Sequence, residues 1–362
     1  MHELSLHEFH QAAGARFTEL NGWEVAAHYG DTQAEYRALQ QNAAVLDLSF
    51  RSRICLTGAD RIRFLNGQVT NNVKDLAVGQ GCYAALVNAK GRLQSDFNIY
   101  CLPEEVLLDF EPGLSALVAE RFNQFIIADD VQVVDVAALY GLISVQGPRA
   151  SEVVATLEGL TELPARDRFM RVACPTLGEI YCMNQPRGTA SGFDLFTPSA
   201  SLAPLANLLW NAARQLGGGL GGWDALEMVR IEAGIPRFGA DMDDTNLAPE
   251  TGIDERAISY TKGCYIGQEV IARIRTYGQV AKALRGLWLP ENLSPLPIRG
   301  DKLYHSGREA GYVTSALASP ALGRNIALGY VRREWNQPGT ALELSTAAGV
   351  TTVQVVALPF RG

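Results

Sequence analysis

The chain lacks the residue patterns that several classes of protein require. Its 362 residues include five histidines, four of them within the first 28 positions, and no HxxxH pattern or Cys/His cluster, so we expect no metal site. No stretch approaches the ~18 consecutive apolar residues of a membrane span. Lys and Arg number 31 against 39 Asp and Glu, a net charge of −8, which argues against a sequence-independent nucleic-acid binder. We therefore expect neither nucleic-acid binding nor a membrane partner.

Cysteine is also sparse, and its spacing carries no pairing signal. The first 17 residues contain neither an apolar run of signal-peptide length nor a basic leader. Six cysteines without a CxxC spacing then indicate reduced thiols and a cytoplasmic location. They are Cys55, Cys82, Cys101, Cys174, Cys182 and Cys264.

Alternating and helical patterns predict an α+β protein for the first three quarters of the chain. Two apolar runs within residues 81–101 flank the turn signal Asn88-Ala89-Lys90-Gly91, and the alternation of the second run places Asp96 on its polar face. Further strands are expected at 106–110, 131–136, 141–146 and 191–196, and helices at 32–45, 61–68, 114–125, 202–216, 223–233 and 267–275.

Two loops and a change of composition complete the prediction. The segment GGGLGG at 217–222 lacks a downstream Lys-Ser/Thr and indicates a turn between helices rather than a phosphate loop. The acidic residues Asp241, Asp243 and Asp244 indicate a solvated loop. After Lys282, short β-like runs separated by Gly and Pro predict a small antiparallel barrel or sandwich. We expect a domain over 1–284 and a C-terminal domain over 285–362.

The segment with the most specific chemistry is KGCYIGQE at residues 262–269. A thiol near a helix N-terminus and two residues from Lys262 is expected to have a lowered pKa, although Glu269 opposes that shift. The alternative is that Cys264 is a small apolar residue that fills a turn.

This octapeptide resembles the signature of the YgfZ family, whose members are folate-binding proteins needed for iron–sulfur enzymes. The blocks GADRIRFLNGQVTNNV, LVNAKGRLQSDFNIY, SVQGPRA, SGFDLFTP and VRIEAGIPRFGAD resemble the wider aminomethyltransferase (glycine-cleavage T-protein) superfamily. The resemblance implies a T-protein-like folate-binding fold of two α+β units plus a C-terminal antiparallel β-barrel. It also implies tetrahydrofolate, or a one-carbon derivative, as the ligand and iron–sulfur client or assembly proteins as partners.

The same resemblance implies roles for individual residues. Asp96 would face the reactive part of the folate, Asp194 would accept the N–H groups of the pterin, and Arg230 would bind a folate carboxylate or orient Asp194. Cys264, activated by Lys262, would be the functional thiol. The plainer alternatives are an exposed strand carboxylate for Asp96, a surface strand residue for Asp194, and a pair with Glu227 or Glu232 for Arg230.

One departure from the T-protein pattern leaves the activity open. The Tyr-Thr-Gly-Glu block before the strand of Asp194 is replaced here by Pro186-Arg187-Gly188-Thr189-Ala190-Ser191. This change puts classical aminomethyl transfer in doubt, whereas the retained Asp96 keeps a folate-dependent aminomethyltransferase or demethylase as the alternative. A scaffold that kept the fold and lost the ligand is the third hypothesis.

Overall fold

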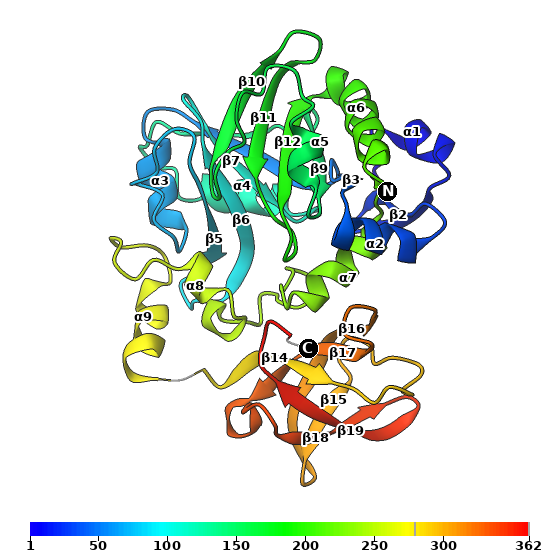
Figure 1. Cartoon of the computed structure of the whole chain (residues 1–362). Coiled ribbons are helices and arrows are strands. Elements are labelled where there is room, and N and C mark those ends of the chain that lie inside the picture. Colours follow the sequence, from blue (N-terminus) through cyan, green and yellow to red (C-terminus); the bar gives the residue numbers. More distant parts are fainter. Residues whose placement is uncertain (279, 361–362) are drawn as a thin grey trace. The chain divides into compact units, whose positions relative to one another are not determined.

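The computed structural model describes residues 1–278 and 280–360, which form two compact units (Figure 1). Unit 1 comprises Met1–Gln68, Asn72–Ala84 and Phe97–Val229. Unit 2 comprises Val69–Asn71, Ala85–Asp96 and the chain from Arg230 onward. Two short segments from the first 96 residues therefore fold with the C-terminal part of the chain.

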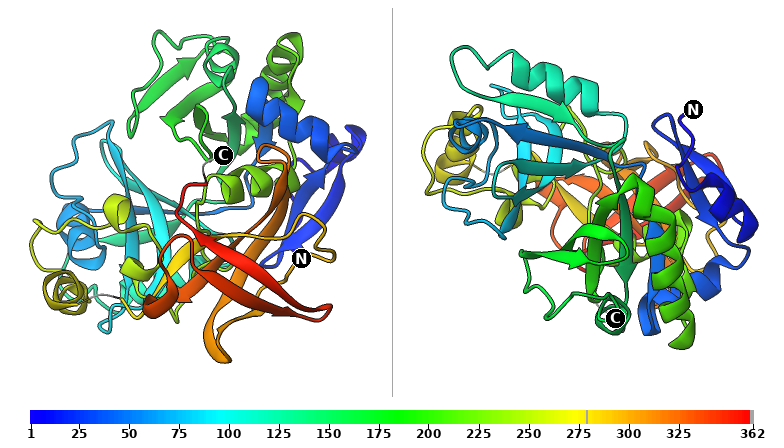
Figure 2. Two further views of the ribbon diagram at one scale, coloured as in Figure 1. Left: turned by 60° about the horizontal axis from the view of Figure 1, so that its bottom comes forward. Right: turned by 90° about the horizontal axis from the view of Figure 1, so that it is seen from above.

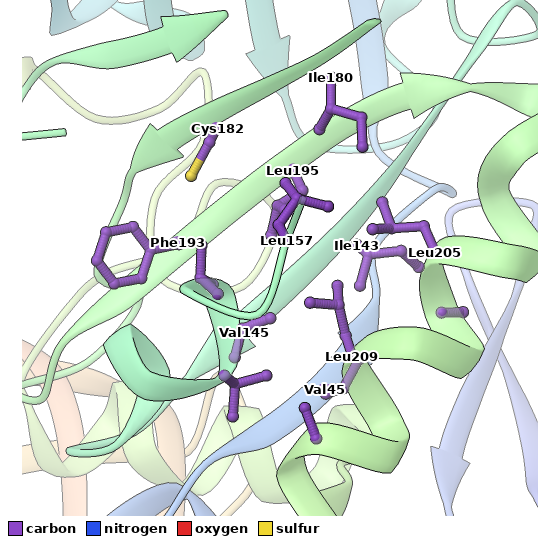
Figure 3. Packing of buried hydrophobic residues seen from close by; sticks show 14 of the residues in the cluster. Val45, Ile143, Val145, Leu157, Ile180, Cys182, Phe193, Leu195, Leu205 and Leu209 are labelled. Atoms are coloured by element: carbon purple, nitrogen blue, oxygen red, sulfur yellow. The ribbon is translucent and has the colours of Figure 1, made fainter. Parts of the chain in front are cut away.

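A six-stranded sheet in the order β10-β11-β12-β9-β3-β13 forms the centre of unit 1. Figure 3 shows Leu205 and Leu209 of helix α6 packed against side chains of this sheet, among them Val45 and Ile143. The sheet elements are β3 (Ala44–Asp47), β9 (Tyr140–Gln146), β10 (Phe169–Cys174), β11 (Gly178–Asn184), β12 (Gly192–Pro198) and β13 (Gly219–Leu220), with α5 (Ala150–Val154) and α6 (Leu202–Gln215) against them.

A second, five-stranded sheet has the order β5-β6-β7-β4-β8. The apolar face of β6 contributes Phe97 and Ile99, both fully buried, as the alternation predicts. Its elements are β4 (Ser52–Thr57), β5 (Gly81–Val87), β6 (Leu93–Cys101), β7 (Val106–Phe110) and β8 (Gln132–Asp135), with α3 (Arg61–Gln68) and α4 (Ser115–Asn123).

The N-terminal part of unit 1 corrects two predictions. The expected helix over 32–45 ends at Gln41, and residues 44–47 form a fully buried strand between β9 and β13 instead. The segment 217–222 is more than a turn, because its β13 pairs in parallel with β3. A Cβ on Gly218 would lie 2.0 Å from the carbonyl oxygen of Ala43, so only glycine allows this approach. The other elements here are α1 (His7–Ala12), β1 (Arg16–Leu20), β2 (Trp23–His28), α2 (Thr32–Gln41) and α7 (Trp223–Glu232).

Unit 2 contains a closed antiparallel barrel in the order β14-β17-β16-β15-β18-β19 (Figures 1 and 2). The predicted α+β fold with a C-terminal antiparallel barrel is confirmed, and the sandwich alternative is wrong. The barrel strands are β14 (Lys282–Trp288), β15 (Lys302–His305), β16 (Arg308–Ser319), β17 (Arg324–Arg332), β18 (Ala341–Thr346) and β19 (Gly349–Val356). Helices α8 (Asp254–Ala257) and α9 (Gln268–Tyr277) and the 3-10 turns η1 (Ser199–Ser201), η2 (Ala248–Glu250) and η3 (Arg333–Trp335) complete the described chain. No helix within residues 1–278 and 280–360 is long and apolar enough to cross a membrane.

Candidate functional site

Asp194 lies in the middle of β12 and is completely buried, which excludes the surface-residue alternative. Its register partner on β9 is Ser144, whose hydroxyl donates to Asp194 Oδ1 at 2.7 Å. Arg187, in the loop that leads into β12, donates from Nε to Oδ1 at 3.2 Å and from Nη2 to Oδ2 at 2.5 Å. The guanidinium therefore occupies the bidentate edge of this carboxylate.

A second buried ion pair lies beside the first. Asp109 of β7, also fully buried, accepts from Arg51 Nε at 2.8 Å and from Asn98 Nδ2 at 3.0 Å. Arg51 also donates from Nη1 to Glu111 at 2.6 Å. Arg187 Nη2 lies 3.5 Å from Asp109 Oδ2, which joins the two pairs. Unit 1 thus contains two arginines and three carboxylates in one buried polar cluster.

The side chain of Gln146 holds the loop of Arg187 in place. Gln146 Nε2 donates to Ser144 Oγ at 2.8 Å and to the Gln185 carbonyl at 3.0 Å, and its Oε1 accepts from the Arg187 backbone N–H at 2.9 Å. A Cβ on Gly192 would lie 2.0 Å from Gln146 Oε1, so glycine leaves the space for that side chain. The replaced block thus places a fixed arginine at Asp194. The replaced block is visible in the sequence, but no local pattern there indicates that Arg187 pairs with Asp194.

The two aspartates of the cluster differ in the balance between burial, which raises the pKa, and the arginines, which lower it. Burial raises the pKa of Asp194, and Arg187 offsets this only in part. Burial acts on Asp109 in the same sense, but Arg51 and then Arg187 outweigh it and lower the pKa of Asp109. Arg187 therefore favours the ionised form of Asp194 against the effect of burial.

Asp96 lies on β6 between the fully buried residues Ser95 and Phe97, and its own side chain is half-buried. Asn98 is half-buried as well, so the polar face predicted by the alternation is confirmed for these two residues. Tyr100, the third member of that face, is buried and donates to Gln185 Oε1 at 3.3 Å. Asp96 belongs to the part of β6 assigned to unit 2, whereas Asp194 belongs to unit 1.

The loop that carries Cys264 is anchored by its lysine. Lys262 is buried, and its Nζ donates to the backbone carbonyls of Val69 at 2.8 Å and Asn71 at 2.6 Å. Two residues further on, Cys264 is exposed. Lys262 therefore fixes the path of the loop that presents the thiol, and its activation of Cys264 stays a prediction.

Cys264 differs from the other cysteines in exposure. All six cysteines carry free thiols; Cys82 is half-buried and the remaining four are buried. Burial raises the pKa of Cys182 to about 12, which leaves that sulfur protonated and unreactive at neutral pH. The exposed thiol in the described chain is thus the one in the octapeptide.

The second half of the octapeptide packs against the β5–β6 turn. Gly267, the N-cap residue before α9, has φ +85°, and a Cβ there would lie 2.6 Å from the carbonyl oxygen of Asn88. Gly91 of the turn has φ +72°, and a Cβ would lie 3.2 Å from Val270 Cγ1. Both motifs singled out from the sequence therefore meet within unit 2.

We expect Gly267→Ala to destabilise the protein by about 2–4 kcal/mol, because left-handed backbone strain and overpacking add. The matched control is Gly263→Ala, since a Cβ at Gly263 meets no atom within 4 Å. Urea unfolding of both variants measures the difference. Equal stabilities would contradict the close packing of α9 on the turn.

Arg230, at the end of α7, is held within unit 2. Its Nη1 donates to Asp241 Oδ2 at 2.5 Å and to the Ile235 carbonyl at 3.2 Å. Asp241 is 1% exposed and also accepts from the hydroxyls of Thr314 at 2.6 Å and Ser315 at 2.7 Å. The prediction of a solvated loop is therefore wrong for Asp241, which links Arg230 to the barrel strand β16. Glu232 accepts from the hydroxyl of Ser319.

The structure groups the predicted residues by unit. Asp194 lies in unit 1 with Arg187, whereas Asp96, Arg230, Lys262 and Cys264 all belong to unit 2. Within residues 1–278 and 280–360, no group of three or more His, Cys, Asp and Glu side chains could hold a metal ion.

Comparison with known proteins identifies the family. Residues 6–262 match the GCVT N-terminal domain, and residues 282–361 match the glycine cleavage T-protein C-terminal barrel domain. The aminomethyltransferase of Saccharopolyspora erythraea is 30% identical, covering 99% of this chain and 97% of that protein. A probable aminomethyltransferase of Natronomonas pharaonis is 31% identical over 98% of both. The crystal structure of the glycine cleavage system aminomethyltransferase T from Bartonella henselae has the same fold, with a TM-score of 0.89, 22% identity and coverage of 99% and 98% of the two chains. The chain therefore belongs to the aminomethyltransferase (glycine cleavage T-protein) family.

Proposed function

We propose that this protein binds a tetrahydrofolate, or a one-carbon derivative of it, and acts as a folate-dependent aminomethyltransferase. The observation that carries the proposal is the end-to-end match with relatives named aminomethyltransferase. This match favours the predicted alternative, a folate-dependent aminomethyltransferase, over the iron–sulfur hypothesis. In this proposal, residues 1–284 form the folate-binding region and residues 285–362 form the barrel domain.

Asp96 is the residue that we assign to the chemistry. Its half-buried carboxylate on the polar face of β6 is suited to hold or move a proton at a ligand nitrogen. When bound, tetrahydrofolate would supply the amine nitrogens that carry the one-carbon unit. Arg230, a buried cation fixed by Asp241, is assigned to bind a carboxylate of the folate.

The fit of a pterin to Asp194 depends on Arg187. A carboxylate that receives two adjacent pterin N–H groups must offer both oxygens, and Arg187 already donates to both. We assign Asp194 to the pterin on the condition that Arg187 turns aside, and Asp109, 3.5 Å away, is placed to receive the guanidinium.

Thermal unfolding with and without tetrahydrofolate tests the folate proposal. At about 100 times its dissociation constant the ligand should stabilise the wild-type protein by roughly 2.7 kcal/mol, a shift of a few degrees. The shift should vanish in Asp194→Ala and persist in Asp135→Ala, which changes an exposed strand carboxylate. No shift in the wild-type protein would reject folate binding and leave the scaffold hypothesis.

A second candidate function is favoured by the exposed thiol of Cys264. As a YgfZ-type protein in a reducing cytoplasm, the chain would use this thiol in the assembly or repair of iron–sulfur clusters in client enzymes. One cysteine is too few ligands to hold a cluster alone, so the contact would be shared with an assembly or client protein. In cells that lack the protein, Cys82→Ala should restore iron–sulfur enzyme activity and Cys264→Ala should not. Restoration by both variants would reject this second function.

A further inference from the structure

A surface cavity of about 320 Å³ lies within unit 2, and none of the residues assigned above lines it. Its walls come from the loop after α7, from residues around η2, from β14 and from the C-terminal segment. They are Gly234, Thr251, Gly252, Leu284, Arg285, Pro338, Ala357 and Leu358. This volume is at the small end of the range for ligand sites, which sets the size of an occupant.

Arg285 is the charged group of this cavity. It is half-buried on β14, where Nε donates to the Asn336 carbonyl at 2.9 Å and Nη1 to the Leu284 carbonyl at 3.0 Å. A guanidinium has five N–H donors, so three of them, including both on Nη2, bond to nothing in the described chain.

The charge of Arg285 is also uncompensated. None of the carboxylates in residues 1–278 and 280–360 forms an ion pair with it, and burial alone lowers its pKa. A positioned guanidinium with three unused donors is suited to bind a carboxylate through two parallel hydrogen bonds.

The other residues that line the cavity indicate the chemistry of the rest of the ligand. Apolar contacts are available from Leu284, Pro338, Ala357 and Leu358. The hydroxyl of Thr251 already donates a hydrogen bond to the Ala248 carbonyl at 2.8 Å. We propose that this cavity binds a small organic acid, with its carboxylate on Arg285 and an apolar body against Leu284 and Leu358. This site is separate from the proposed folate site and does not depend on it.

Benzoate is a suitable probe, because it combines one carboxylate with a flat apolar body that this volume accommodates. Thermal unfolding of the full chain should show a rise of a few degrees with millimolar benzoate at constant ionic strength, and no rise with benzamide, its neutral analogue. Isothermal titration should show at least a tenfold loss of affinity in Arg285→Gln. Arg308→Gln, which removes an exposed arginine from the same barrel, should bind as the wild-type protein does.

A second variant separates loss of the site from loss of the fold. Ala357→Leu keeps Arg285 and fills the cavity from its exposed edge, so it too should bind benzoate at least tenfold more weakly. Unchanged affinity in Arg285→Gln, or an equal rise with sodium chloride, would overturn the proposal. An equal response to inorganic phosphate would overturn the apolar part of the assignment.

Discussion

Replacement of Arg187 by methionine is expected to lower the free energy of unfolding by about 3–5 kcal/mol. The substitution leaves Asp194, which is 0% exposed, with the Ser144 hydroxyl but without its cationic partner. An unpaired buried carboxylate pays a desolvation penalty that methionine, although similar in length, cannot offset. Urea unfolding at neutral pH measures the loss.

Two further variants show whether the loss comes from the buried pair. Arg171→Met removes an arginine whose side chain is 63% exposed and pairs with Glu179 on the surface, so it should cost less than about 1 kcal/mol. The double variant Arg187→Met/Asp194→Leu removes both charges and should recover most of the stability. A loss in the double variant as large as in the single one would assign the effect to packing instead.

The destabilisation by Arg187→Met should also depend on pH. Burial already raises the pKa of Asp194 against the partial opposition of Arg187, so removal of the arginine raises it further. A carboxyl group whose pKa is raised in the folded state costs the protein no stability below its unfolded-state pKa, near 4. The protein then loses stability as the pH rises from that value through the folded-state pKa. The difference from the wild-type protein should therefore be smallest near pH 4 and grow toward pH 8. The opposite trend would contradict a buried, unpaired Asp194.

Elements with their own local signals were predictable from the sequence. The helix at residues 61–68 agrees with the structure at both ends, and the six β-like runs after Lys282 became the six strands of the barrel. Strands whose position depends on pairing with distant segments of the chain were not predictable in this way. The stretch 44–47 continues a helical pattern, and its burial between β9 and β13 makes it a strand. Gly219 and Leu220 pair with residues about 175 positions earlier, which no local pattern reveals.

Prediction of the candidate site from the sequence has the same limit, because local patterns do not reveal contacts between distant residues. Alternation placed Asp96 on the polar face of its strand because that information is local. The ion pair of Asp194 with Arg187 depends on how the loop before β12 folds back on Gln146. The burial of Asp241 depends on hydroxyls from a barrel strand more than 70 residues away. A stretch of acidic residues in the sequence, such as Asp241, Asp243 and Asp244, is therefore not by itself evidence of a solvated loop.

Asp96→Asn is expected to lower aminomethyl transfer to tetrahydrofolate by about 100-fold or more, because the amide cannot take up a proton. The substitution preserves shape and hydrogen-bonding capacity, so the thermal shift with tetrahydrofolate should persist. Formation of methylenetetrahydrofolate from an aminomethyl donor is the measurement. Asp135→Asn, on an exposed position of β8, is the matched control and should transfer as the wild-type protein does.

The same assay separates the two candidate functions when Cys264→Ala is included. An aminomethyltransferase that depends on Asp96 should keep its activity within about twofold in Cys264→Ala, because an exposed thiol on the anchored loop takes no part in proton transfer at the folate nitrogen. If the wild-type protein binds tetrahydrofolate and transfers nothing, the family fold serves a different chemistry. The exposed thiol then becomes the functional group, and the iron–sulfur hypothesis replaces aminomethyl transfer.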